Sequence, residues 1–98
     1  MNKSFNQVIE NVDISYVPMY GIYVLNNDVT PFEFVVVFLV RAFNISEVEA
    51  EKIAVSAHKN GSECCKIYPK DIAECVFERI KSMLVKEAYN LEFELKEM

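Results

Sequence analysis

The stretch Leu25–Phe34, LNNDVTPFEF, joins a predicted strand to a predicted helix and decides how the rest of the chain is interpreted. The segment before it, MYGIYVL at 19–25, is aromatic and β-branched, which is typical of a strand. Within it, Thr30 and Glu33 have the spacing of a capping box, with a proline at the first helical position. The following valines favour a strand and periodicity cannot decide, but the start signal favours a helix over 31–43.

A second helix follows with clearer boundaries. Ser46 and Glu49 form another capping box, and Asn60 with Gly61 supplies a stop, so a helix is predicted over 47–59. Beyond it, ECCKIY is typical of a short strand, and the proline that follows opens a third helix. Apolar side chains recur there at helical spacing: Ile72, Cys75, Val76, Ile80, Met83 and Leu84.

The C-terminal segment NLEFELKEM alternates cleanly between apolar and charged residues. Leu91, Phe93 and Leu95 share one face, which predicts a half-buried strand in a sheet with one wet face. With the short strand at 63–68 and the third helix at 70–88, the order is β-α-α-β-α-β. We therefore predict an α+β fold, a three-stranded antiparallel sheet packed on one face by three helices.

Length and charge set limits on the class of protein. The 98 residues suggest one domain, here 18–98, preceded by a flexible N-terminal arm at 1–17. The net charge of −5 argues against a nucleic-acid binder. The N-terminus lacks the apolar region of a signal peptide, and the run 34–40 is too short to cross a bilayer, so we expect no membrane association.

The three cysteines do not suggest a disulfide framework. Their number is odd, and Cys64 and Cys65 are adjacent and would alternate across a strand. With Cys75 they are interpreted as core residues of a protein in a reducing, cytoplasmic compartment. One histidine leaves no Cys/His zinc spacing, and there is no glycine-rich phosphate loop, so no metal or cofactor is expected.

Five polar residues remain as candidates for chemistry: Asn26, Asn27, Asp28, Thr30 and His58. Taken singly, each has an ordinary structural explanation: a turn for the loop residues, a cap for the threonine, and a favourable helix terminus for the histidine. His58 and Asp28 could form an acid–base pair, but no nucleophile accompanies them. Taken together, they place hydrogen-bond acceptors beside an apolar groove, which suits capture of an N-terminal amine.

At this point the residues resemble a known family. MYGIYVLNNDVTPFEFVVVFLVRAF and AEKIAVSAHKNGSECCKIYPKDIAE resemble the ClpS adaptor, the N-degron recognition subunit of the bacterial Clp protease. The family pattern N-D-D-x-T-P-x-E-F-V corresponds to 26–35 here, and H-x-x-G corresponds to His58 and Gly61. The resemblance covers about residues 19–98.

The resemblance implies a function without catalysis. A ClpS adaptor binds the free N-terminus of a protein that begins with Leu, Phe, Tyr or Trp, and delivers it to the AAA+ unfoldase ClpA, which feeds the ClpP peptidase. By resemblance this chain is a cytoplasmic bacterial adaptor, monomeric, whose arm at 1–17 engages the unfoldase. The alternative is a regulator of the same fold that docks on the unfoldase without recognising degrons.

The resemblance also assigns residues to three sites. The amine contacts fall on Asn26, Asn27, Asp28, Thr30 and His58. The apolar pocket falls on Phe32, Val35, Leu39, Ala54 and Ala57. The unfoldase contact, at the start of the third helix, falls on Asp71 and Glu74.

The chain departs from the family pattern at several of these positions. Asn27 stands where an aspartate is usual, and Phe32 replaces a gate residue that is commonly methionine. Ala54 and Ala57 stand where larger residues are usual, so our hypothesis is that two smaller walls make room for a larger gate.

Two departures lie outside the pocket. Val76 occupies a place where the family can carry a basic residue in its unfoldase contact. Val37 and Val40 stand where polar residues are common, so we predict an apolar strip between Glu33 and Arg41 that serves as a partner or self-contact surface.

Overall fold

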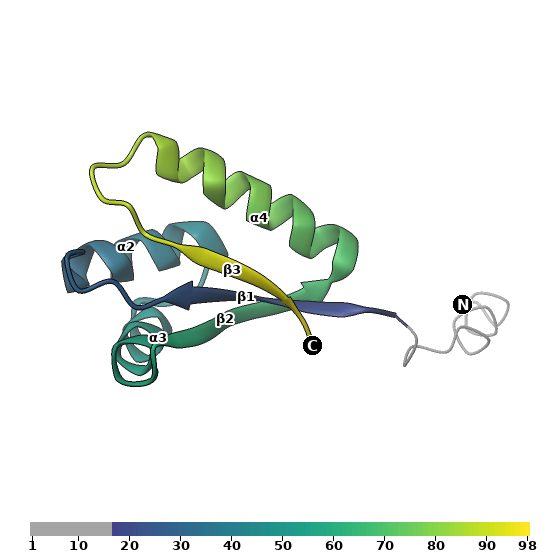
Figure 1. Cartoon of the computed structure of the whole chain (residues 1–98), viewed down its shortest axis with the longest axis horizontal. Coiled ribbons are helices and arrows are strands. Elements are labelled where there is room, and N and C mark those ends of the chain that lie inside the picture. The colour runs from purple at the N-terminus through teal and green to yellow at the C-terminus, as the bar shows by residue number, and fades with distance from the viewer. Residues whose placement is uncertain (1–16) are drawn as a thin grey trace, which may run out of the picture.

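The computed structural model describes residues 17–98, so the arm predicted at 1–17 lies, apart from Val17, outside the described residues. The predicted order β-α-α-β-α-β is confirmed (Figure 1). The elements are β1 (Met19–Leu25), α2 (Phe32–Phe43), α3 (Glu47–Asn60), β2 (Ser62–Pro69), α4 (Lys70–Val85) and β3 (Phe93–Glu97).

The three strands form one antiparallel sheet in the order β2-β1-β3, with β1 in the middle. Ile22 and Val24 of β1 are almost fully buried, and their partners on β3 are Leu95 and Phe93. Because side chains alternate along a strand, these residues share the face on which the helices pack. Figure 1 shows α4 running along the sheet, with α2 and α3 beside the end of β1.

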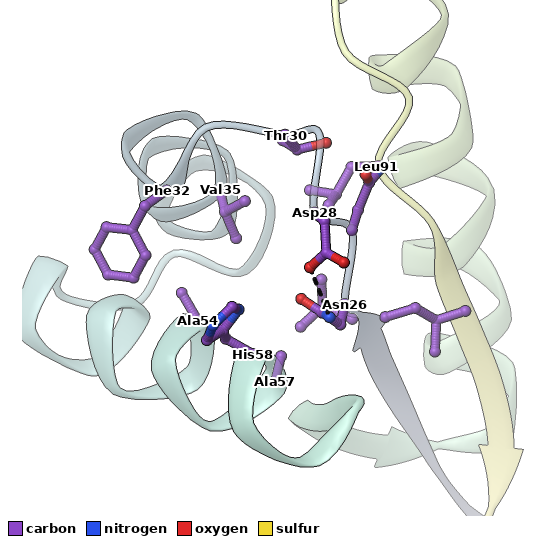
Figure 2. Close-up of a pocket in the computed structure, with 12 residues that line it drawn as sticks. Asn26, Asp28, Thr30, Phe32, Val35, Ala54, Ala57, His58 and Leu91 are labelled. Atoms are coloured by element: carbon purple, nitrogen blue, oxygen red, sulfur yellow. Dashed lines mark hydrogen bonds between the residues drawn. The ribbon is translucent and has the colours of Figure 1, made fainter.

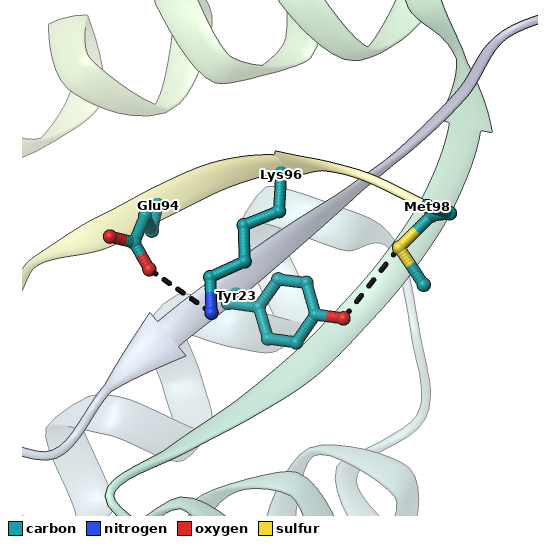
Figure 3. Close-up of polar contacts among 4 residues, drawn as sticks. All are labelled: Tyr23, Glu94, Lys96 and Met98. Carbon is teal, nitrogen blue, oxygen red and sulfur yellow. Dashed lines mark hydrogen bonds and ion pairs between the residues drawn. The ribbon is translucent and has the colours of Figure 1, made fainter.

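The opposite face of the sheet is polar, as the alternation in the C-terminal segment predicts. The Lys96 Nζ atom lies 3.4 Å from Glu94 Oε1 and 4.7 Å from the centre of the Tyr23 ring (Figure 3). The Tyr23 hydroxyl donates to Met98 Sδ at 3.6 Å. A Cβ atom on Gly21 would lie 2.9 Å from the same sulfur, so a larger residue there would require the Met98 side chain to shift.

The start of α2 differs from its predicted capping box. The residue before the helix is Pro31, with ψ 142°, and no side chain caps the helix. The Thr30 N–H instead donates to the Asn27 carbonyl, which draws Thr30 into the loop, where its buried Oγ1 has no hydrogen-bond partner within the described residues. The helix itself is present as predicted, but the cap is wrong because the turn at 27–30 ends before the helix begins.

The boundaries of α3 follow the predicted signals closely. The Ser46 Oγ atom accepts a hydrogen bond from the Glu49 N–H at 3.1 Å. Gly61 has φ 92°, a conformation that favours glycine, and its N–H donates to the Ala57 carbonyl at 2.8 Å. This firm C-terminal stop fixes the last turn of α3, which carries His58 and Ala57.

The cysteine prediction is right for Cys65 and wrong for Cys75. All three cysteines are free; Cys65 is buried, Cys64 is half-buried and Cys75 is exposed. The buried face of α4 is centred on Ala73 and Ile80, which turns Cys75 toward solvent. The helix ends at Val85, three residues earlier than predicted.

Candidate functional site

A cavity of about 310 Å³ lies where β1 ends, α2 begins and α3 finishes (Figure 2). It brings together every residue predicted for the amine and pocket sites except one. Its lining consists of Val24, Leu25, Asn26, Asn27, Asp28, Thr30, Phe32, Val35, Ala54, Ala57, His58 and Leu91.

The exception is Leu39, which was predicted to line the pocket. Its side chain is fully buried in the hydrophobic core and does not line the cavity. Leu39 lies one helical turn beyond Val35 on the same face of α2, so this face passes from the cavity into the core between these two positions.

Sequence reasoning missed three lining residues: Val24, Leu25 and Leu91. The alternation along β1 already placed Val24 on the helix-facing side at the end of the strand. Alternation in the C-terminal segment likewise placed Leu91 on the buried face, but as part of a strand, whereas β3 begins only at Phe93.

The polar rim begins at Asn26. Its backbone N–H donates to the Gly61 carbonyl at 2.8 Å, which fastens the end of β1 to the end of α3. Its side-chain Nδ2 donates to Asp28 Oδ1 at 3.2 Å. This hydrogen bond fixes the amide, and Asn26 Oδ1 stays available as an acceptor, with no partner within residues 17–98.

Asp28 and His58 face the cavity from opposite sides. Figure 2 shows Asp28 beside Asn26 on the loop, and His58 rising from α3 next to Ala54 and Ala57. Both are exposed, and the described residues contain no hydrogen bond or ion pair between them. The structure thus brings the two groups to one cavity without the direct contact that an acid–base pair uses.

Asn27 also lines the cavity, but backbone groups occupy both ends of its side chain. Its Nδ2 donates to the Asn90 carbonyl at 2.8 Å, and its Oδ1 accepts from the Val29 N–H at 3.0 Å. The amide therefore links the loop to the segment before β3, and its predicted contact with a ligand amine stays a prediction.

The apolar walls come from α2, α3 and the segment before β3. Ala54 and Ala57 are buried, and their short side chains leave the space that the cavity occupies. Phe32 stands at the mouth, with 46% of its surface exposed. Together, these walls could accept an apolar side chain, while the rim offers an amide oxygen, a carboxylate and an imidazole as acceptors.

The predicted unfoldase-contact residues lie elsewhere. Asp71 and Glu74 are exposed in the first turns of α4, and Val76 is half-buried against the core. Val37 is 55% exposed on α2, whereas Val40 is half-buried. A contact role for the strip between Glu33 and Arg41 stays a prediction.

The described part of the chain contains neither a candidate metal cluster nor a membrane-spanning helix. Within residues 17–98 there is no group of three or more histidine, cysteine, aspartate or glutamate side chains placed to hold a metal ion. No helix among these residues has the length and apolar character needed to cross a membrane.

The comparisons of this chain with known proteins agree on one protein family. The family model described as ATP-dependent Clp protease adaptor protein ClpS matches residues 15–94. The ATP-dependent Clp protease adapter protein ClpS of Clostridium acetobutylicum is 35% identical over 80 residues, covering 82% of this chain and 79% of that protein. The ClpS of Herminiimonas arsenicoxydans is also 35% identical over 80 residues, covering 82% and 78%.

A solved structure is similar as well. Agrobacterium tumefaciens ClpS2 bound to L-phenylalaninamide superposes with a TM-score of 0.76 at 29% sequence identity. The match covers 84% of this chain and 99% of the ClpS2 chain, so nearly all of the ClpS2 structure has a counterpart here.

Proposed function

The chain belongs to the ClpS family of ATP-dependent Clp protease adaptor proteins, which are not enzymes. From this premise we propose which degrons it binds and to which unfoldase it delivers them. It binds the free N-terminus of proteins that begin with Leu, Phe, Tyr or Trp. It then delivers them to the AAA+ unfoldase ClpA, which passes them to ClpP. It acts in the bacterial cytoplasm as a monomer.

The observation that carries this proposal is the pairing of acceptors with apolar walls in one cavity. An α-ammonium group has three N–H donors, and the rim presents Asn26 Oδ1, Asp28 and His58. The first side chain of the substrate enters between Val35 and the two alanines of α3. Acetylation removes the charge and two donors, which leaves rim groups unpaired at about 1–3 kcal/mol each.

The solved relative supports the same ligand chemistry. L-phenylalaninamide, the molecule bound to Agrobacterium tumefaciens ClpS2, has a free α-amino group, a benzyl side chain and an amide in place of a carboxylate. It is therefore the smallest analogue of a protein that begins with phenylalanine. The cavity here combines the corresponding apolar and acceptor groups.

The second candidate is a regulator that docks on the unfoldase without binding degrons. Two features favour it: the Asn27 side chain already bonds backbone groups at both ends, and Phe32 stands at the cavity mouth, where the family commonly has methionine. Under this candidate the fold and the unfoldase contact at Asp71 and Glu74 are retained, while free N-termini are not bound.

A degradation assay separates the two candidates. Purified ClpA and ClpP are given a fluorescent reporter that begins with Phe or Leu, with or without this chain, beside a matched reporter that begins with Met. The adaptor accelerates ATP-dependent loss of the first two reporters only, and His58→Ala abolishes that acceleration. Binding to ClpA without acceleration of any reporter would favour the regulator.

A further inference from the structure

Leu91 is a pocket wall that no helix or strand carries. It is 2% exposed, lines the cavity, and lies between α4 and β3 in a segment, 86–92, without regular secondary structure. Leu91 itself packs in the hydrophobic core, and the Tyr89 ring of the same segment lies 5.0 Å from the Phe34 ring, so apolar contacts hold part of the segment. The backbone on either side of Leu91 is held in addition by hydrogen bonds to Asn90 and Glu92.

One neighbour is tied to the last residue of β1 and the other to the loop that follows this strand. The Glu92 carbonyl accepts a hydrogen bond from the Leu25 N–H at 3.0 Å, which continues the pairing of β1 with β3. The Asn90 carbonyl accepts from Asn27 Nδ2 at 2.8 Å. The first bond needs no particular side chain, whereas the second exists only because residue 27 has an amide.

We propose that Asn27 is a positioning residue: through its hydrogen bond to Asn90 it holds Leu91 against the cavity, and it does not contact the ligand amine. This inference rests on the proposed function, because it names a determinant of the same pocket. It also gives a physical reason for an amide at this position. Both polar ends of Asn27 are used, and the ligand amine is left to Asn26, Asp28 and His58.

The substitution Asn27→Asp tests this role because the two accounts predict opposite signs. An ionised aspartate still accepts from the Val29 N–H, but it has no donor for the Asn90 carbonyl. Its carboxylate and that carbonyl are both acceptors and repel each other. If Asn27 holds Leu91, the variant loses the wall. If residue 27 instead faces the ligand ammonium, the added negative charge strengthens binding.

The measurement is the affinity of peptides that begin with Phe, Leu or Ala, each free and N-acetylated, for wild type, Asn27→Asp, Leu91→Ala and the double variant. We expect Asn27→Asp to weaken the free Phe and Leu peptides about tenfold. The Ala peptide and the ratio of free to acetylated affinity stay as in wild type. The double variant binds no more weakly than Leu91→Ala, because both changes remove one wall.

Tighter or unchanged binding of the Phe and Leu peptides by Asn27→Asp would overturn the proposal, as would full additivity in the double variant. Amide hydrogen exchange gives a second test that needs no ligand. Residues 86–92 should exchange faster in Asn27→Asp while α3 keeps its protection, and an unchanged rate in 86–92 overturns the proposal. If wild type binds no peptide at all, the proposed function fails, and the exchange data still decide the role of Asn27.

Discussion

At the scale of single residues, the family motif predicted most of the residues that surround the cavity. It did not predict which contacts each side chain makes. The positions of Asn26, Asp28 and His58 around one cavity were predicted, and the structure brings them together. The hydrogen bonds of Asn27 and the burial of Leu39 could not be predicted from the sequence. One depends on a carbonyl 63 positions along the chain, and the other on where the helix face passes into the core.

Phe32 is the residue at which a substitution tests ligand preference most directly. It stands at the cavity mouth, on the same side as Ala54 (Figure 2). Phenylalanine is stiffer and bulkier than methionine, which adapts to irregular spaces. The hypothesis that Ala54 and Ala57 compensate for it predicts that Phe32→Met changes the order of affinity for peptides that begin with Leu, Phe, Tyr and Trp.

The matched control for this prediction is Val37→Met, which places the same side chain on an exposed part of α2 away from the cavity. Its affinities should follow wild type throughout the peptide panel. An identical ranking in Phe32→Met and wild type would remove the compensation hypothesis.

At the scale of elements, a helix terminus was predictable where its free backbone groups form hydrogen bonds with residues nearby in sequence. Ser46 and Gly61 bound α3 as predicted because their partners lie within a few residues. Thr30 does not cap α2 because its N–H bonds the Asn27 carbonyl in a turn, and the motif does not specify that turn. The bulge in β2, which leaves Cys65 between the partners of Ile22 and Tyr23, had no signal in the sequence.

The buried thiol in this bulge makes a pH-dependent contribution to stability. Burial raises the pKa of Cys65 to about 12, opposed by a backbone hydrogen bond from Val24. The unfolded thiol releases its proton near pH 8.5–9 and the folded one keeps it, so stability is fully present below about pH 9 and falls toward pH 12. Between pH 9 and 10 the loss from this group is about 1 kcal/mol.

Urea unfolding at pH 7, 9 and 10 measures this contribution. Cys65→Val should lose about 1 kcal/mol less than wild type between pH 9 and 10. Cys75→Val, at an exposed position, should lose as much as wild type. Equal losses in wild type and Cys65→Val would contradict the assigned cause.

At the scale of the whole molecule, the ligand cavity and the predicted unfoldase contact lie at opposite ends of β1 (Figure 1). Met19 pairs with Pro69, directly before α4, and Leu25 pairs with Ser62, beside the cavity. Seven strand residues at about 3.3 Å each separate the two ends by roughly 20 Å. One end can therefore hold a substrate while the other meets a partner.

This separation predicts that the two binding events respond to different substitutions. Asp71→Lys with Glu74→Lys reverses two exposed charges at the start of α4 and should weaken binding to ClpA at least tenfold. The affinity for a peptide that begins with Phe should stay within twofold of wild type. Surface plasmon resonance with immobilised ClpA measures the first quantity and fluorescence anisotropy the second.

The control for that pair is Glu47→Lys with Glu51→Lys, two exposed charges on α3 away from the start of α4. Unchanged ClpA binding in the Asp71 and Glu74 double variant would place the unfoldase contact elsewhere. A loss of peptide affinity in the same variant would contradict the independence of the two ends.

The overall architecture was predictable because all elements except α2 have a clear sequence pattern and the connections are short. What the patterns do not encode is the path of the segment 86–92, which closes the cavity with Leu91. That path is set by hydrogen bonds between residues far apart in sequence, such as Leu25 to Glu92. Local propensity contains no information on such pairs.

The central claim is that the cavity recognises a free N-terminal amine beside a large apolar side chain. Titration calorimetry with a peptide that begins with Phe, its N-acetylated twin and an otherwise identical peptide that begins with Ala tests it most directly. We predict micromolar or tighter binding of the free Phe peptide, and a loss of at least tenfold for each of the other two. Equal affinity for the free and acetylated Phe peptides would contradict the claim.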